Sequence, residues 1–446
     1  MTASSENVLL LEVSMSRHQG RPGTLTRRQS VPTPDEPCAD CLTEAEAPRR
    51  RPLTIGRTIG RPVAFWVVTY LFATIMLGTT LPTPLYVIYQ AQWHFSSGII
   101  TIIFASYAVG VLAALLLAGR SSDQVGRRPV LFAALAFSAV STVVFILSPG
   151  IGWLFVGRVL SGISSGLATG TATAALTDIY SGSSPRRASM VATAANMGGL
   201  GLGPLIAGLF AQFGPGPTVL VFEVYLGLLA VAVIGLVYVP ETVGERQKLS
   251  LRFTGLGIPP NGRSEFIAAG VAGFAAFALL GMFTSLAPSF LGAVLHEHSH
   301  AVGGAVVFAI FGTATATQLV LARYASRAVM LIGLIVFLAG LALVVAGLSQ
   351  ASLALFLIGT IVSGVAIGAV FIGSVSTAVR LAPAEIRGRV ASTYFVFAYV
   401  GLTIPVIGVG IGSQYEGDFR AVLVCAIVLA ALSAVSMAGI RRAASG

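Results

Sequence analysis

Long apolar runs are the feature that most constrains this chain. Stretches of about 20 residues with few charged side chains recur from residue 63 to residue 440, which is the length a helix needs to cross a bilayer. Strand-type alternation of apolar and polar residues is absent. Because only helices and closed barrels satisfy their backbone hydrogen bonds in lipid, the sequence predicts an all-α membrane protein.

Composition agrees with this fold class. Hydrophobic residues make up 55% of the 446 residues and charged residues 10%, whereas soluble proteins contain about 25% charged residues. A net charge of +10 can accompany nucleic-acid binding. Cytoplasmic loops of membrane proteins also collect Lys and Arg. We therefore expect a lipid bilayer, and no nucleic acid, as the chain's environment.

Charges and turn residues divide the apolar sequence into twelve predicted transmembrane helices, six on each side of a polar linker. The predicted helices are 63–88, 97–118, 129–148, 151–175, 188–212, 218–239, 264–292, 301–322, 328–347, 351–379, 389–412 and 420–440.

The same division predicts the domain organisation. Residues 1–60 are polar and rich in Arg and Pro, which is typical of a disordered tail. Residues 61–239 form the first six-helix bundle, residues 240–263 a linker, and residues 264–442 the second bundle. A lone CxxC in the tail has no second pair with which to complete a zinc site, so no metal is expected.

The distribution of Lys and Arg predicts the orientation. If the tail is cytoplasmic, all of these residues except Arg158 and Arg420 lie in the tail, in cytoplasmic loops, in the linker or at the C-terminal end. The positive-inside rule therefore predicts two cytoplasmic termini. We expect a multi-pass protein of the plasma membrane.

The two predicted bundles repeat each other at a spacing of about 200 residues. Paired halves of this kind are common in secondary transporters. The matching segments are SGISSG (161–166) with SGVAIG (363–368), Thr80-x-x-x-Pro84 with Thr284-x-x-x-Pro288, Arg187 and Thr193 with Arg387 and Thr393, and Asp123 and Arg127 with Arg323 and Arg327.

One charged segment between two apolar runs carries a motif. It reads Gly119-x-x-x-Asp123-x-x-Gly126-Arg127-Arg128-x-x-Leu131, and we call residues 119–128 the latch segment. The motif resembles the loop 2–3 signature of the major facilitator superfamily, G-x-L-A-D-R-x-G-R-K/R-x-x-L. Ser121, Ser122 and Gln124 replace the usual Leu, Ala and Arg. The resemblance covers roughly residues 61–442 and implies two pseudo-symmetric six-helix bundles.

The resemblance also implies a role for the latch segment. Asp123 is expected to face the N-terminus of the helix at 389–412, where unpaired N–H groups carry partial positive charge. Arg127 is expected to pair with Asp178, as the family's equivalent arginine does. These contacts would hold the two halves together on the cytoplasmic side. The alternative is an ordinary positively charged loop.

Arg158 raises the free energy of inserting the predicted helix 151–175 into a bilayer, because an arginine there needs a partner or a water-filled cavity. With Gly162 it fits the family's Arg-x-x-x-Gly signature. Glu223 is the one carboxylate clearly inside a predicted span. We predict that Arg158 and Glu223 interact and that Glu223 carries a proton. The alternative is a static ion pair near the headgroups.

Glycines predict close helix packing. Gly162 and Gly166 share one helix face. On the next helix, Gly199-x-x-x-Gly203-Pro204-x-x-x-Gly208 is similar to the G-x-x-x-G-P-x-x-G-G signature of the family's antiporters, with Ala207 in place of one glycine. The similarity implies drug–proton antiport, and the alternative is generic close packing.

The substrate cavity in this family is lined by the first and seventh helices. Its candidate residues here are Thr80, Tyr86, Gln90, Phe283 and Thr284.

The resulting hypothesis is a monomeric secondary transporter that exports small amphipathic molecules in exchange for protons. One alternative is a proton-coupled uptake symporter for a sugar or other metabolite, since PET at 240–242 resembles a segment of sugar transporters. An alternative of another class is a non-transporting sensor or scaffold on the same fold. The sequence has no Walker A motif and no complete set of metal ligands, and its GISSG segment (162–166) lies inside a predicted transmembrane helix rather than at a GxSxG elbow, so we expect neither an enzyme nor a cofactor.

Overall fold

The computed structural model describes residues 59–180, 185–244, 247–248, 255–324 and 327–445. They belong to one unit that begins at Leu53. The predicted tail up to residue 58, with the CxxC of Cys38 and Cys41, lies outside the described residues.

The described residues form helices and no strand. Twelve of the helices are long and apolar enough to cross a membrane, which confirms the predicted fold class. The first half contains α1 (Arg61–Thr80), α3 (Ser97–Ala118), α5 (Arg127–Ile146), α6 (Ile151–Ile179), α7 (Pro185–Phe213) and α8 (Pro217–Tyr238). The second half contains α9 (Arg263–Ala293), α10 (His300–Leu321), α11 (Arg327–Ser349), α12 (Leu353–Arg380), α13 (Arg387–Glu416) and α14 (Asp418–Ser445). Shorter elements are α2 (Tyr86–Trp93), α4 (Ser121–Val125) and the 3-10 turn η1 (Ala384–Ile386).

The first helix ends earlier than the predicted 63–88. Helix α1 stops at Thr80 and a turn leads into α2. Pro82 and Pro84 have no N–H, so two backbone bonds of a continuing helix cannot form. The N–H of Thr83 bonds to the carbonyl of Thr80 instead, at 3.1 Å. In the matching segment of the second half, α9 passes through Pro288 and continues to Ala293.

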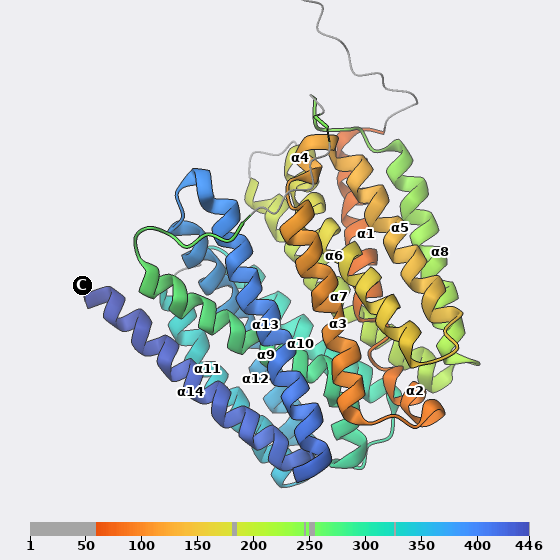
Figure 1. Ribbon diagram of the computed structural model, residues 1–446, viewed down its shortest axis with the longest axis vertical. Coiled ribbons are helices and arrows are strands. Elements are labelled where there is room, and N and C mark those ends of the chain that lie inside the picture. Colours follow the sequence, from red (N-terminus) through yellow and green to blue (C-terminus); the bar gives the residue numbers. More distant parts are fainter. Residues whose placement is uncertain (1–58, 181–184, 245–246, 249–254, 325–326, 446) are drawn as a thin grey trace, which may run out of the picture. The chain divides into compact units, whose positions relative to one another are not determined.

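The two halves have largely separate hydrophobic cores, and Figure 1 shows them as two groups of helices. One core is built from α1 to α8 and the other mainly from α9 to α14. The halves meet where α3 packs on α13 and where α7 packs on α10. Phe104 and Tyr107 of α3 belong to the core of the second half.

The repeated glycines make equivalent contacts in the two halves. A Cβ on Gly162 of α6 would lie 2.2 Å from the backbone oxygen of Tyr107 on α3, and a Cβ on Gly166 would lie 2.7 Å from the Cβ of Ala114. On α12, a Cβ on Gly368 would lie 2.5 Å from the backbone oxygen of Ala314 on α10. Small residues at these positions let the helix backbones touch.

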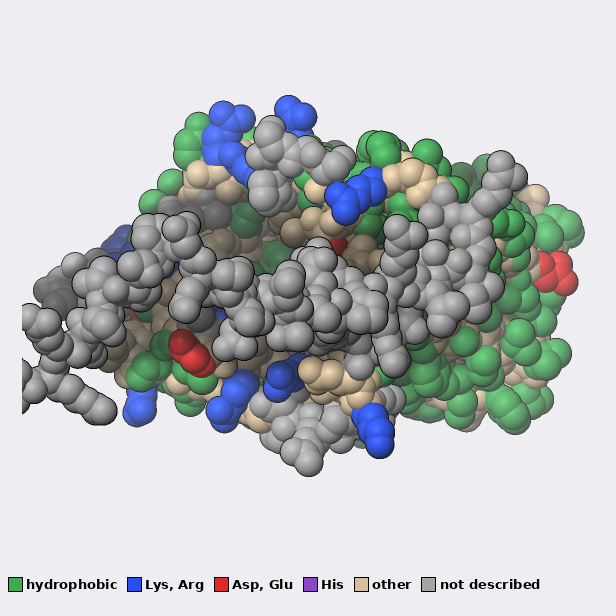
Figure 2. Space-filling model, turned by 90° about the horizontal axis from the view of Figure 1, so that it is seen from above, with side chains coloured by type: hydrophobic (Ala, Val, Ile, Leu, Met, Phe, Trp, Pro, Cys, Tyr) green, Lys and Arg blue, Asp and Glu red, His purple; other side chains and the backbone are tan. Residues whose placement is uncertain are grey.

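At one end of the helix bundle α3 stops, α5 begins and the linker is found, and we call this the linker end. The other end of the bundle is called the opposite end. Figure 2 looks onto the linker end, where Lys and Arg side chains lie around the face.

Candidate functional site

A cavity of about 140 Å³ lies between the two halves. Both halves contribute to its wall, with residues from α1, α3, α6 and α7 facing residues from α9, α10, α12 and α13. The lining residues are Met76, Thr79, Thr80, Phe104, Tyr107, Arg158, Thr169, Thr193, Asn196, Met197, Leu200, Phe277, Leu280, Thr284, Phe311, Gln318, Phe371, Phe395, Tyr399 and Leu402.

Arg158 is the one Arg, Lys, Asp, Glu or His among these lining residues. Its side chain, on α6, is only 1% exposed. Nη1 donates a hydrogen bond to the backbone oxygen of Thr79. The guanidinium carbon lies 5.5 Å from the ring centre of Phe104 and 4.8 Å from that of Tyr107. Two aromatic rings therefore stabilise the buried cation.

The carbonyl of Thr79 is available because of the break in α1. In a continuing helix it would accept the N–H of Thr83. That N–H bonds to Thr80 instead, so Thr79 accepts from Arg158. A cation at this position also interacts favourably with the partial negative charge at the C-terminal end of α1.

Two buried donors on the cavity wall have no hydrogen-bond partner among the described residues. They are Nε of Arg158, from the first half, and Nε2 of Gln318 on α10, from the second half. Gln318 is 4% exposed. A buried donor without a protein partner costs free energy unless water or a ligand satisfies it.

The cavity continues toward the linker end. A second cavity of about 330 Å³ shares Thr193, Gln318 and Phe371 with the first. The wall of the second cavity also contains Arg186, near the start of α7, and Ala322, just after the end of α10.

Close helix contacts seal the opposite end. A Cβ on Gly208 of α7 would lie 2.5 Å from the backbone oxygen of His300 on α10. Near the start of α3, a Cβ on Gly98 would lie 2.3 Å from Nε2 of Gln414 on α13. The two halves therefore touch beyond the cavity at the opposite end, while the linker end is hollow.

Two of the five predicted cavity residues line the cavity. Thr80 and Thr284 do so, and the hydroxyl of Thr80 donates to the backbone oxygen of Leu200 at 2.7 Å. Tyr86 and Phe283 are buried in the helix packing, outside the cavity wall. Gln90 on α2 bonds to Ser97 at 3.5 Å.

The predicted pair of Arg158 and Glu223 is not formed in this structure. Glu223 is exposed on α8. The buried face of α8 contains Phe222, Tyr225 and Leu229, and Glu223 falls outside it because successive residues of a helix turn by about 100°. Arg158 bonds to Thr79 instead.

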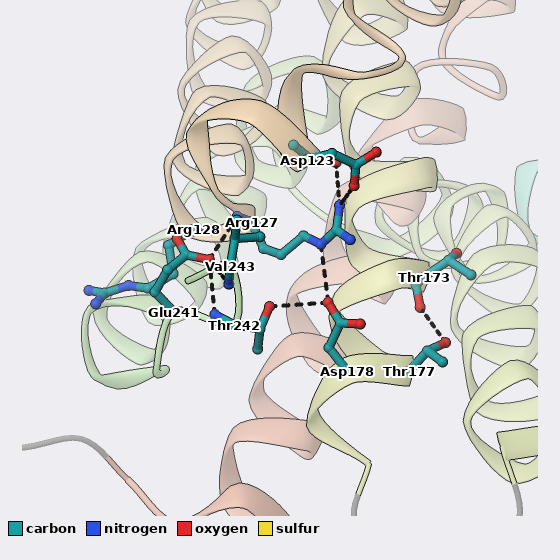
Figure 3. Close-up of polar contacts among 10 residues, drawn as sticks. Asp123, Arg127, Arg128, Thr173, Thr177, Asp178, Glu241, Thr242 and Val243 are labelled. Carbon is teal, nitrogen blue, oxygen red and sulfur yellow. Dashed lines mark hydrogen bonds and ion pairs between the residues drawn. The ribbon is translucent and has the colours of Figure 1, made fainter. Parts of the chain in front are cut away.

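In the latch segment, Arg127 connects three residues of the first half (Figure 3). Its Nε lies 3.2 Å from Oδ2 of Asp178 at the end of α6, the predicted pair. Its Nη1 forms an ion pair with Asp123 and donates to Oγ of Ser122 at 2.8 Å. The contacts of Arg127 therefore join α4, α5 and α6.

The predicted contact of Asp123 with the start of α13 is replaced by its ion pair with Arg127. The side chain of Asp123 is 64% exposed. The second cavity lies between the halves at this end, so the latch segment holds together the first half rather than both halves. Gly119 caps the end of α3, just before α4.

Glu241, which follows α8, was not among the predicted site residues. Its carboxylate accepts the N–H groups of Arg127 and Arg128, at 2.9 and 3.2 Å, and those of Thr242 and Val243. The side chain therefore caps the start of α5, where unpaired N–H groups favour an anion. Gly126 has φ +109°, and a Cβ there would lie 2.4 Å from Oε2 of Glu241. Arg128 also donates to the backbone oxygen of Val237 at 2.7 Å.

The second half contains a related charge cluster. Glu265 on α9, which is 5% exposed, lies 2.6 Å from Nη2 of Arg327 and 2.8 Å from Nη2 of Arg380. Arg327 matches Arg127 in the repeat. The acid, however, lies on α9, and an arginine stands at the end of α12, where the first half has Asp178 at the end of α6.

The glycines of the antiporter-like motif place α7 between α1 and α10. A Cβ on Gly199 would lie 2.5 Å from the backbone oxygen of Ala73, and one on Gly203 would lie 2.3 Å from that of Leu77. On the other face, a Cβ on Gly304 of α10 would lie 2.3 Å from the backbone oxygen of Pro204. The motif therefore joins α7 to both halves.

Comparison with known proteins agrees with this architecture. The family model of the Major Facilitator Superfamily matches residues 63–328. A class D tetracycline resistance protein of Salmonella ordonez is 38% identical over 26% of this chain and 29% of its own length. A triacylglyceride transporter of Mycobacteroides abscessus is 32% identical over 30% of this chain and 26% of its own length. The chain thus matches less than a third of the length of either relative.

A solved structure shows the same fold over most of the chain. It is a bacterial homologue of the human lysosomal transporter Spinster, in an inward-facing and unoccupied conformation. The match has a TM-score of 0.67 and 14% identity, and it covers 86% of this chain and 98% of the other. With twelve apolar helices, a central cavity and the family model across more than half of its length, the chain is a multi-pass integral membrane protein of the Major Facilitator Superfamily.

Proposed function

We propose that the chain is a secondary active transporter that exports small amphipathic molecules by alternating access. The observation that carries this proposal is the cavity between two repeated halves, which opens toward the linker end and is sealed at the opposite end. The positive-inside rule supports a cytoplasmic linker end. In this conformation the site would accept a molecule from the cytoplasmic side of the plasma membrane.

The return half of the cycle follows from the same contacts. Separation of Gly208 from α10 and of Gly98 from α13 would open the opposite end. Rocking of the halves would then close the linker end and bring Asp123 of the latch segment toward the first turn of α13. Charge-assisted hydrogen bonds contribute about 1.5–3 kcal/mol each, so ligand binding can outweigh a few of them.

Two features favour export over uptake. The glycine motif of α7 is similar to the antiporter signature, and its glycines contact both neighbouring helices. One matched relative is named a tetracycline resistance protein. The PET segment, which favoured a sugar symporter, has a structural role here, because Glu241 caps α5.

We also propose that a proton gradient drives transport, as the antiporter-like motif implies. Neither cavity wall contains an Asp or Glu among the described residues. A carboxylate that carries the proton would therefore act from outside the cavity in this conformation, and Glu223 is the candidate within a span. Glu223→Gln tests it: transport in everted vesicles that persists unchanged under a pH gradient would remove Glu223 from coupling.

A reversible cross-link tests alternating access. In a background with Cys38→Ser, Cys41→Ser and Cys425→Ala, we would introduce Gln212→Cys and His300→Cys at the opposite end. The backbone N–H of His300 donates to the Oε1 of Gln212 at 3.0 Å, so a short thiol cross-linker can join α7 to α10 there.

Transport would be followed in everted vesicles with a panel of amphipathic compounds and a pH-sensitive dye. We expect the cross-link to abolish transport and reduction to restore it, with each single-cysteine variant unaffected by the reagent. Full transport by the cross-linked protein would contradict alternating access at this site. A panel that gives no transport in the uncross-linked protein would contradict export and favour the sensor or scaffold.

A further inference from the structure

We propose that the cavity takes an amphipathic organic anion, whose charged group bonds to Arg158 and whose apolar body lies among aromatic side chains. This inference rests on the proposed transport function and names its substrate class. It goes beyond the family, since the superfamily fold does not itself select a charge.

The fixed charge of the cavity is positive. Arg158 is buried, and among the described residues its hydrogen-bond acceptor is a neutral backbone carbonyl, that of Thr79. Neither cavity wall contains Asp or Glu among the described residues, and Arg186 adds a second guanidinium to the wall nearer the linker end. A buried cation without a neighbouring carboxylate favours an anionic ligand, because the ligand then supplies the missing counter-charge.

The hydrogen-bond donors without a partner on the cavity wall also favour an anionic ligand. Nε of Arg158 and Nε2 of Gln318 are both donors, and they come from opposite halves of the same cavity. A carboxylate or sulfonate offers only acceptors and can satisfy Nε of Arg158. Gln318 lies beside Thr193, roughly 15 Å nearer the linker end than the level of Arg158, so it would bond to a second acceptor of a longer ligand. An ammonium group offers only donors, so it would leave Nε of Arg158 unpartnered and would lie beside a like charge.

The two aromatic rings nearest the buried charge are already engaged by a cation. The rings of Phe104 and Tyr107 already lie near the guanidinium of Arg158. The rest of the wall is mainly apolar and suits the body of an amphipathic molecule. Its other aromatic residues are Phe277, Phe311, Phe371, Phe395 and Tyr399.

A matched set of ligands tests the inference on the full chain. The probes are 2-naphthoate, 2-naphthamide and 2-naphthylmethylammonium, which share one ring system and differ in charge. Binding is measured as ligand-induced thermal stabilisation of the purified protein in detergent, and transport as uptake into proteoliposomes. We expect 2-naphthoate to stabilise the protein most and 2-naphthylmethylammonium least.

Gln318→Glu is the decisive variant, because it keeps the side-chain shape and places a carboxylate on the cavity wall. We expect it to weaken 2-naphthoate binding about fivefold, since its carboxylate repels the charge of the ligand from roughly 15 Å across the same cavity. The control is Gln350→Glu, at an exposed position after α11, which should leave binding unchanged. Arg158→Lys keeps the charge and should retain part of the preference for the anion.

The outcomes separate this inference from the proposed function. Preferential binding of 2-naphthoate that Gln318→Glu reduces supports the inference, even if no probe is transported and the transport proposal fails. Transport of the probes without preference for the anion, or equal stabilisation by the cation, overturns the inference and leaves transport standing. No stabilisation by 2-naphthoate at millimolar concentration also overturns it.

Discussion

Arg158 donates a hydrogen bond from its Nη1 to the backbone oxygen of Thr79, so that a buried arginine of α6 caps the last turn of α1. The same side chain presents its unpartnered Nε to the cavity. One guanidinium therefore joins the end of a helix in the first half to the site where we expect the ligand to bind. A ligand that attracts Arg158 would also act on the end of α1.

Arg158→Met should lower the thermal stability of the purified protein. It leaves the carbonyl of Thr79 without this donor and removes the contact with the helix end, at a cost of about 1–3 kcal/mol. Arg158→Lys should cost less, because a cation remains near the carbonyl. Thermal unfolding in detergent checks the order. If the Met variant is as stable as the wild type, the cap contributes nothing measurable.

Gly203→Ala should disrupt the packing of α7 on α1, since its Cβ would lie 2.3 Å from the backbone oxygen of Leu77. The helices would have to move apart, and we expect reduced thermal stability and reduced transport together. Gly198→Ala is the matched control on the same helix, because a Cβ there has nothing within 4 Å. Expression, melting temperature and vesicle transport of the two variants are compared. Equal behaviour of both would show that close approach at Gly203 is dispensable.

The lengths of the apolar runs and the positions of the turn residues predict most of the helix bounds. The bounds of α3 agree with the predicted 97–118, and the other long helices begin or end within a few residues of their predictions, except the first. The first helix is followed by two prolines in the segment LPTPL (81–85). A proline by itself does not predict the end of a membrane helix, because α9 continues through Pro288. The break depends on both prolines acting within one turn.

The site was harder to predict, because a helix that is apolar all round does not show which face is buried. Helix α8 is such a helix, so the depth of Glu223 in the membrane could be predicted, but the side of α8 on which it lies could not. Gln318 had a usable signal, since it is a lone amide in an apolar helix. Glu241 had none, because capping of α5 by a residue after α8 requires the tertiary structure. The partner of Asp123 depends on the conformation of the whole transporter.

Glu241→Ala and Gly126→Ala should destabilise the protein through the same contact. The first removes the carboxylate that accepts the N–H groups of Arg127 and Arg128. The second introduces a Cβ that displaces the carboxylate and strains a backbone with φ +109°. In a double-mutant cycle followed by thermal unfolding, the two losses should therefore not add. Additive losses would mean that the cap and the glycine act independently.

Glu265→Gln should destabilise the second half more than any exposed ion pair does. Glu265 is buried and lies within 2.6 and 2.8 Å of Arg327 and Arg380, so the variant loses two charge-assisted contacts at the start of α9. Because Arg380 is largely exposed, we expect a cost of about 2 kcal/mol rather than the larger loss of a fully buried pair.

Glu416→Gln is the matched control for this prediction. Its carboxylate pairs with Arg420 at 3.5 Å, and both side chains are more than half exposed. An exposed pair of this kind contributes less than about 1 kcal/mol, because water and salt screen it. Melting temperatures at low and high salt check both variants. Glu265→Gln should lower the melting temperature at both salt concentrations, since Glu265 itself is shielded from solvent. A loss that vanishes at high salt would place the cluster among ordinary surface pairs.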